Sequence, residues 1–176
     1  MATVAELLER NKAYAPNHVA LPYISEAMAA GQVLATTAII TCADPRCTPE
    51  AFLDLKGPGA IVLRSAGGRV KPVLNSLLYI DGLLQLSELM VIHHTDCGAT
   101  KMTDEQARGA LKQRVPDYNE MDSLEFNTFK PEDLANSVKD DVKFVKQHPL
   151  VRKTLADGSV GFTYDIKTGK LTPVEV

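Results

Sequence analysis

The sequence predicts an α/β fold with a mainly parallel β-sheet flanked by helices, an N-terminal helical arm and an antiparallel hairpin at the C-terminal edge. Short uncharged runs rich in β-branched residues alternate with segments of helical periodicity, which is typical of strands buried on both faces. The chain has 176 residues, the size of one domain, and contains no internal repeat or long linker. We therefore expect a single domain over residues 1–176, with a helical arm over 1–30 and an α/β core over 33–176.

Three buried strands are predicted, and each leads into a segment of polar residues. They cover residues 33–41, 60–64 and 89–93. The tail, residues 159–176, has the pattern of a strand, a turn and a second strand, which indicates a hairpin at the edge of the sheet.

The first helices are indicated by apolar stripes and by prolines. Two short helices are expected within residues 1–30, separated at Pro16, the second running from near His18 towards Gly31. Thr48 and Pro49 have the pattern of a helix N-cap and first turn, and the Gly-Pro-Gly segment at 57–59 is expected to stop that helix.

Three further helices follow from capping and periodicity. Pro72 begins a helix with apolar residues on more than one face, so we expect it to be buried all round. Thr103 and Gln106 form a capping box that predicts a helix to about Arg114. Pro131 begins the last helix, whose apolar residues recur at helical spacing until His148.

Composition excludes several classes of partner. The net charge is −3 and the sequence pI is about 5.8, so we expect no nucleic-acid binding. The longest segment without charged residues, 27–43, is too short and too polar to span a membrane. The N-terminus lacks the apolar core of a secretory signal, so we expect a cytoplasmic protein whose three cysteines stay reduced.

Cys42, His94 and Cys97 are the candidate metal ligands. Each lies at or just after the carboxyl end of a predicted strand, where ligands gather in open parallel sheets. Two thiolates and one imidazole are donors that zinc favours, and three protein ligands leave one coordination position open for water. The expected cofactor is therefore Zn²⁺.

Asp44 and Arg46 are the candidate catalytic pair. In an extended segment, residues two apart point to the same side, and Pro45 favours that geometry. Arg46 would keep Asp44 ionised, so that the carboxylate accepts the proton of a zinc-bound hydroxide and orients its lone pair. Alternatively, Asp44 could bind the zinc itself and close the site.

These motifs, Cys42-x-Asp44-x-Arg46 and His94-x-x-Cys97-Gly98, resemble those of the β-class carbonic anhydrases. The resemblance implies that Cys42, His94 and Cys97 bind zinc and that Asp44 and Arg46 are catalytic. It also implies a homodimer or a higher even oligomer. We expect Ser65, Ala66, Gly67 and Gly98 to contribute to substrate binding. The chain also resembles a short subgroup that includes hydrolases of carbonyl sulfide and carbon disulfide.

The leading hypothesis is zinc-dependent hydration of carbon dioxide to bicarbonate by attack of a zinc-bound hydroxide. The alternative is hydrolysis of carbonyl sulfide or carbon disulfide at an equivalent site. A catalytically idle, zinc-stabilised dimer with a binding or regulatory role is the hypothesis from another class. Outside the site, Cys47 is expected to be a packed thiol and His93 a core or interface histidine, because it alternates with His94 along the strand.

Overall fold

The computed structural model describes residues 2–56 and 59–176, and the chain divides into two units, the first ending at Leu34 and the second beginning at Ala35. The first unit contains α1 (Val4–Tyr14), the 3₁₀ turn η1 (Ala15–Asn17) and α2 (Ile24–Ala29). Thr3 and Glu6 form a capping box at the start of α1. The second helix begins at Ile24, later than predicted, because Pro22 disfavours helical backbone at the residue before it.

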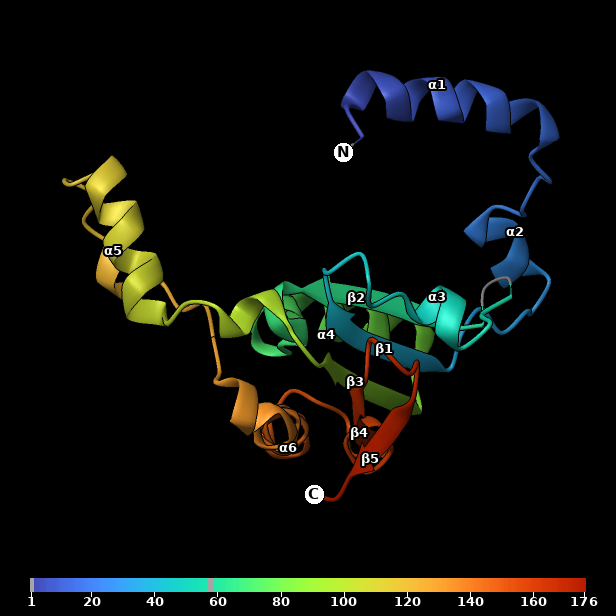
Figure 1. Cartoon of the computed structure of the whole chain (residues 1–176). Helices are drawn as coiled ribbons and strands as arrows, with labels where there is room; N and C mark the ends of the chain where they lie inside the picture. Colours follow the sequence, from blue (N-terminus) through green and yellow to red (C-terminus); the bar gives the residue numbers. More distant parts are fainter. Residues whose placement is uncertain (1, 57–58) are drawn as a thin grey trace. The chain divides into compact units, whose positions relative to one another are not determined.

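The second unit is built on a five-stranded sheet with the order β2-β1-β3-β4-β5 (Figure 1). The strands are β1 (Thr37–Cys42), β2 (Ile61–Ser65), β3 (Glu88–His94), β4 (Ser159–Tyr164) and β5 (Leu171–Val174). The first four run parallel, and β4 and β5 form the predicted antiparallel hairpin. The predicted fold class is therefore confirmed.

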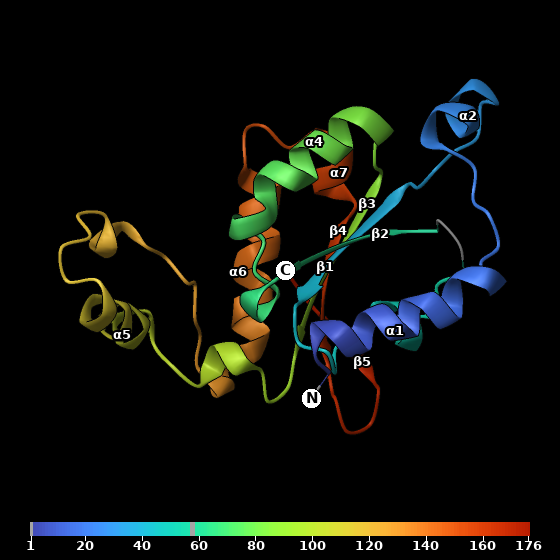
Figure 2. The ribbon, with the colours of Figure 1, turned by 90° about the horizontal axis from the view of Figure 1, so that it is seen from above.

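Helices cover the sheet mainly on one face (Figure 2). The helices of this unit are α3 (Pro49–Phe52), α4 (Leu74–Leu84), α5 (Asp104–Arg114), α6 (Leu134–Gln147) and α7 (Lys153–Asp157). The 3₁₀ turns are η2 (Ala66–Gly68), η3 (Lys71–Val73), η4 (Gly98–Thr100), η5 (Met121–Ser123) and η6 (Pro131–Asp133). None of the helices in the described part of the chain is long and apolar enough to cross a membrane.

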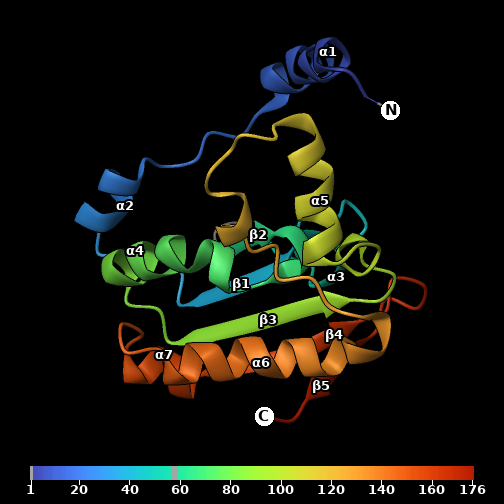
Figure 3. The same ribbon diagram turned by 90° about the vertical axis from the view of Figure 1, so that its left-hand side faces the viewer.

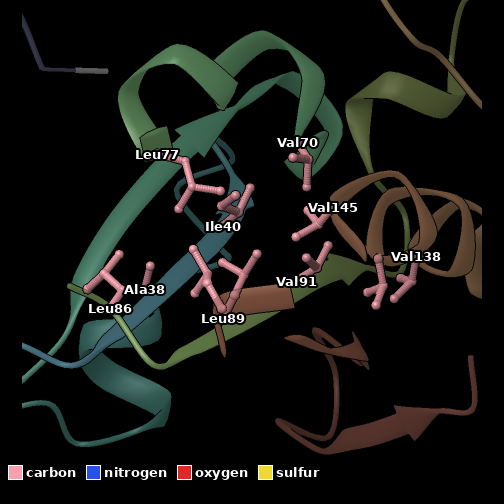
Figure 4. Packing of buried hydrophobic residues seen from close by; sticks show 11 residues of the cluster. Ala38, Ile40, Val70, Leu77, Leu86, Leu89, Val91, Val138 and Val145 are labelled. Atoms are coloured by element: carbon pink, nitrogen blue, oxygen red, sulfur yellow. The ribbon is translucent and has the colours of Figure 1, made fainter. Parts of the chain in front are cut away.

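The main core lies between the sheet and helices α4, α6 and α7. It contains eleven buried apolar residues, most of which are labelled in Figure 4. Ile40 and Val91 project from the sheet towards Leu77 of α4 and Val145 of α6 (Figure 4). Figure 3 shows α6 lying alongside the strands β3 and β4. The apolar spacing of α6 predicted this face, because Val138, Val142 and Val145 are all buried.

Besides the start of the second helix, three predictions from the sequence need correction. The first strand begins at Thr37 instead of residue 33, since Val33 is exposed. Helix α3 ends at Phe52 after one turn, before the Gly-Pro-Gly segment that was predicted to stop it. Residues 57 and 58 of that segment lie outside the described residues. Helix α4 is not buried all round: Tyr79 is 78% exposed, and the helix buries only Leu77 and Asp81. The apolar residues of α4 extend beyond the face that packs against the sheet, so some of them remain exposed.

Gly161 of β4 allows α6 to approach the sheet closely. A Cβ at this position would lie 2.4 Å from Val138 Cγ1 and 3.2 Å from Val142 Cγ2. We expect Gly161→Ala to lower the free energy of unfolding by about 1–3 kcal/mol through overpacking. Gly109 of α5 has no atom within 4 Å of such a Cβ, so Gly109→Ala should be neutral or stabilising by up to about 1 kcal/mol. Urea unfolding of both variants measures the difference, and equal midpoints would contradict the predicted crowding.

Candidate metal centre

The candidate ligands meet at the carboxyl edge of the parallel strands. The chain passes from β1 to β2 on one side and from β3 to β4 on the other, so the connections that follow these two neighbouring strands lead to opposite sides of the sheet (Figure 1). Such a switch point leaves a crevice in which open α/β sheets bind ligands. Cys42 is the last residue of β1, His94 is the last residue of β3, and Cys97 follows three residues later.

The three side chains form a compact, buried donor set. Their ligand atoms all lie within 4.8 Å of one another, and Cys42 Sγ is 3.7 Å from Cys97 Sγ. His94 Nδ1 lies 2.9 Å from the carbonyl oxygen of Thr95, which makes Nδ1 the donor and leaves Nε2 with its lone pair free. Nε2 is buried without a hydrogen-bond partner. A buried, unpaired imidazole nitrogen beside two sulfur atoms fits a bound cation.

The ionisation of the two thiols also favours a cation. The pKa of Cys42 is lowered by hydrogen bonding to Cys97, against the opposing effect of burial, and further by His94 and the Asp44 N–H. The pKa of Cys97 is raised, because the Cys42 thiolate and burial disfavour a second negative charge. A divalent metal ion removes this repulsion and allows both sulfurs to bind as thiolates.

Asp44 and Arg46 form the predicted ion pair beside these ligands. Arg46 Nε donates to Asp44 Oδ1 at 3.0 Å and Nη2 donates to Oδ2 at 2.7 Å, a bidentate geometry. Hydrogen bonding to Arg46 lowers the pKa of Asp44 to about 2, so the carboxylate is ionised at neutral pH. Asp44 Oδ2 also lies 3.8 Å from His94 Nε2. The carboxylate therefore faces both the guanidinium and the candidate metal ligands.

Sequence reasoning missed two further charged residues at this site. Asp96 accepts a hydrogen bond from Arg46 Nη1 at 3.0 Å and another from Lys101 Nζ at 2.6 Å. Lys101 and then Arg46 lower the pKa of Asp96 to about 2. Asp96 is visible in the sequence within the His94-x-x-Cys97 segment, but its pairing with Arg46, fifty residues away, depends on the fold.

Arg64 of β2 holds the turn that carries the first motif. Its Nη1 donates to the carbonyl oxygens of Cys42 and Cys47 at 3.1 and 2.7 Å, and its Nη2 donates to Glu50. The backbone between Cys42 and Cys47, which includes the Asp44–Arg46 pair, is thus fixed from the neighbouring strand.

The loop after β2 packs closely against the metal ligands. Ser65 Oγ donates to the carbonyl oxygen of Arg69 at 2.7 Å, and Gly67 and Gly68 are buried. Gly68 has a φ of +75°, and a Cβ there would lie 2.9 Å from Ile92 O and 3.2 Å from Cys42 N. Ala66 and Gly98 are exposed. The predicted role of Ser65, Ala66, Gly67 and Gly98 in substrate binding stays a prediction.

His93 and Cys47, which were not expected to bind the metal, are buried and make polar contacts, as predicted. His93 is fully buried and makes contacts with Ser137 Oγ at 2.7 Å, Gly68 O at 3.1 Å and Asp141 Oδ2 at 3.1 Å. Cys47 is also fully buried, with its Sγ 3.1 Å from Thr41 Oγ1. Burial, and then the neighbouring Cys42 thiolate, raise the pKa of Cys47 against the opposing effects of Thr41 and Arg64, which suits a packed thiol.

Comparison with known proteins agrees with this geometry. Residues 37–171 match the carbonic anhydrase family model. The chain is 32% identical over 141 residues to β-carbonic anhydrase 1 of Mycobacterium tuberculosis, covering 78% of this chain and 80% of the relative. Its structure is similar to the crystal structure of a carbonic anhydrase from Streptococcus mutans, with a TM-score of 0.82. The two sequences are 31% identical, and the comparison covers 99% of each chain.

A group of relatives with lower sequence identity is named carbon disulfide hydrolase. The chain is 27% identical over 157 residues to carbon disulfide hydrolase of Saccharolobus solfataricus, covering 76% of this chain and 74% of the relative. The family match spans most of the chain and includes every candidate metal ligand. The chain therefore belongs to the β-class carbonic anhydrase family, whose relatives include carbon disulfide hydrolases.

Proposed function

We propose that this protein hydrates carbon dioxide to bicarbonate at a zinc ion held by Cys42, His94 and Cys97. The observation that carries the proposal is the convergence of these three buried donors beside an ionised carboxylate. When bound, zinc supplies a Lewis acid that makes water nucleophilic near neutral pH. The family match and the relatives named carbonic anhydrase support this substrate.

Asp44 is the residue that we propose to orient the nucleophile. Its ionised carboxylate accepts a hydrogen bond from the attacking oxygen, which aims a lone pair at the carbon of the substrate. Arg46 holds both carboxylate oxygens and keeps them deprotonated. The same bidentate pairing restrains the carboxylate from turning onto the metal, so it favours an open site.

The test combines metal content with turnover. Zinc is measured in untreated, purified protein by mass spectrometry, and carbon dioxide hydration is followed by stopped flow with a pH indicator. We expect about one zinc per chain, since the three ligands form one site with a fourth position open, and hydration that disappears when the metal is removed. Protein without zinc, or zinc-loaded protein that does not hydrate carbon dioxide, would overturn the proposal.

Hydrolysis of carbon disulfide or carbonyl sulfide is the second candidate, which is favoured by the relatives named carbon disulfide hydrolase. Both reactions need a nucleophilic water and a linear heterocumulene, so the same residues support either. Turnover of carbon dioxide and of the two sulfur substrates by one zinc-loaded preparation separates the two. A higher kcat/KM on a sulfur substrate would reverse the order of the candidates.

We also propose that the protein forms a homodimer or a higher even oligomer in the cytoplasm. Helix α4 exposes Tyr79 and Leu83, and the neighbouring hollow of about 400 Å³ is lined in part by Leu63 of the edge strand β2. These apolar side chains suit a contact with a second copy. The three buried free cysteines suit a reducing compartment. Light scattering measures the molecular mass in solution. A mass of 19.1 kDa, that of a single chain, would contradict the proposed dimer.

A further inference from the structure

Asp96 occupies an unusual position in the turn between two metal ligands. Its backbone is left-handed, with a φ of +51°, a conformation that few residues other than glycine, asparagine and aspartate adopt readily. The side chain of Asp96 contacts Arg46 and is not one of the candidate metal ligands, although it lies between two of them in the sequence. The strained turn therefore brings a carboxylate to the guanidinium.

Arg46 is held by two acidic residues from separate parts of the chain. Nε and Nη2 bind the carboxylate of Asp44, while Nη1 binds Asp96 Oδ2 and Nη2 also donates to the Asp96 carbonyl oxygen at 3.0 Å. The Arg46 side chain is about half exposed. An exposed arginine with a single partner samples several geometries, because its long side chain loses entropy when it is fixed. The second partner removes that freedom.

Lys101 completes the arrangement. Its Nζ binds Asp96 Oδ1 at 2.6 Å, so each oxygen of this carboxylate has its own cationic partner. The charges alternate along the series Asp44, Arg46, Asp96 and Lys101. In such a series each side chain fixes the orientation of the next, and the entropy cost of ordering it is shared.

We propose that Asp96 is a positioning residue for catalysis, which fixes Arg46 so that Arg46 holds Asp44 in its orientation towards the metal site. This inference rests on the proposed function, in which the Asp44–Arg46 pair orients the nucleophile. Lys101 acts one step further away by orienting Asp96. The proposal assigns to the His94-x-x-Cys97 turn a second role besides supplying metal ligands.

The test is a double-mutant cycle of Asp96→Asn and Arg46→Gln. Asparagine keeps the shape of Asp96 and tolerates the left-handed backbone, so the substitution removes the charge without disturbing the turn. We expect Asp96→Asn to lower kcat/KM for carbon dioxide roughly tenfold, as charge-assisted hydrogen bonds are lost. In the Arg46→Gln background the same change should lower kcat/KM less than about twofold, since its effect passes through Arg46.

Zinc content and thermal stability distinguish positioning from a structural role. Asp96→Asn should retain the zinc content of the parent protein, and Asp157→Asn, which neutralises the partner of Lys153 in another exposed ion pair, should leave kcat/KM unchanged. Lys101→Gln provides a second variant at an exposed site, with an expected loss of roughly threefold in kcat/KM. If Asp96→Asn does not fold, an unchanged kcat/KM in Lys101→Gln overturns the inference.

The remaining outcomes separate this inference from the proposed function. An unchanged kcat/KM in Arg46→Gln would remove the Asp44–Arg46 pair from the mechanism and the inference with it. A loss in Arg46→Gln without a loss in Asp96→Asn would overturn the inference alone. Equal losses from Asp96→Asn in both backgrounds, or loss of zinc in that variant, would show that Asp96 shapes the turn without acting through Arg46.

Discussion

Replacing Cys97 with serine is expected to abolish zinc binding and, with it, the hydration of carbon dioxide. Serine is similar in size, but its hydroxyl stays protonated and is a poor ligand for zinc compared with a thiolate. The two remaining donors, Cys42 and His94, do not complete a zinc site. We expect zinc content to fall to roughly a tenth or less and turnover to fall by roughly 10³-fold or more, because the pKa of unbound water returns to 15.7.

Cys47→Ser is the matched control for this prediction. Cys47 is buried close to the site and would undergo the same exchange of sulfur for oxygen, yet its Sγ pairs with Thr41 and not with the metal ligands. The Cys47→Ser variant should keep its zinc, although the buried hydroxyl lowers the stability of the protein. Elemental analysis and stopped-flow assays compare the two proteins. Full zinc content in Cys97→Ser, or equal loss in both variants, would contradict the assigned ligand set.

Asp44→Asn is expected to retain zinc and to lose most of its turnover. Because Arg46 lowers the pKa of Asp44 to about 2, the side chain is ionised throughout the usual assay range. Asparagine removes that charge at every pH, and its amide presents only one acceptor oxygen to Arg46. We expect kcat to fall by roughly 10²-fold, the range for a positioned proton acceptor. Since the carboxylate is not counted among the three ligands, zinc content should change little.

Asp54→Asn controls for the change in net charge. Asp54 is exposed and pairs with Lys56, and it is not one of the candidate metal ligands. Its variant should match the parent protein in both zinc content and kcat. If Asp44→Asn also kept the parental kcat, Asp44 would have no part in the mechanism; if it lost its zinc, the carboxylate would be acting as a ligand.

The core and the metal motif were predictable because each depends on local patterns. The capping box at Thr103 predicted both ends of α5, and the valine spacing of α6 predicted the face that this helix buries. Runs rich in β-branched residues identified the first three strands, β1, β2 and β3, to within a few residues. Parallel strands place their carboxyl ends at one edge, and so Cys42 and His94 could be brought together from the sequence alone.

Other features depended on contacts between distant segments. Helix α4 has apolar residues on more than one face, and only the structure shows which face meets the sheet and which exposes Tyr79. Nothing in the sequence indicates that Arg152 pairs with the buried Asp81, because the two residues are 71 positions apart. In the structure Arg152 donates to both carboxylate oxygens of Asp81. Pairings of this kind leave no periodic pattern, because each involves one residue from each segment.

The α/β class, the ligand types and their placement at strand ends follow from the amino-acid sequence, because periodicity and side-chain chemistry are properties of short segments. The series of four charges, in which Asp96 and Lys101 extend the Asp44–Arg46 pair, follows from the way distant segments pack together. Ion pairs form over a few ångströms, and the turn between His94 and Cys97 lies near Arg46 because β1 and β3 pair side by side.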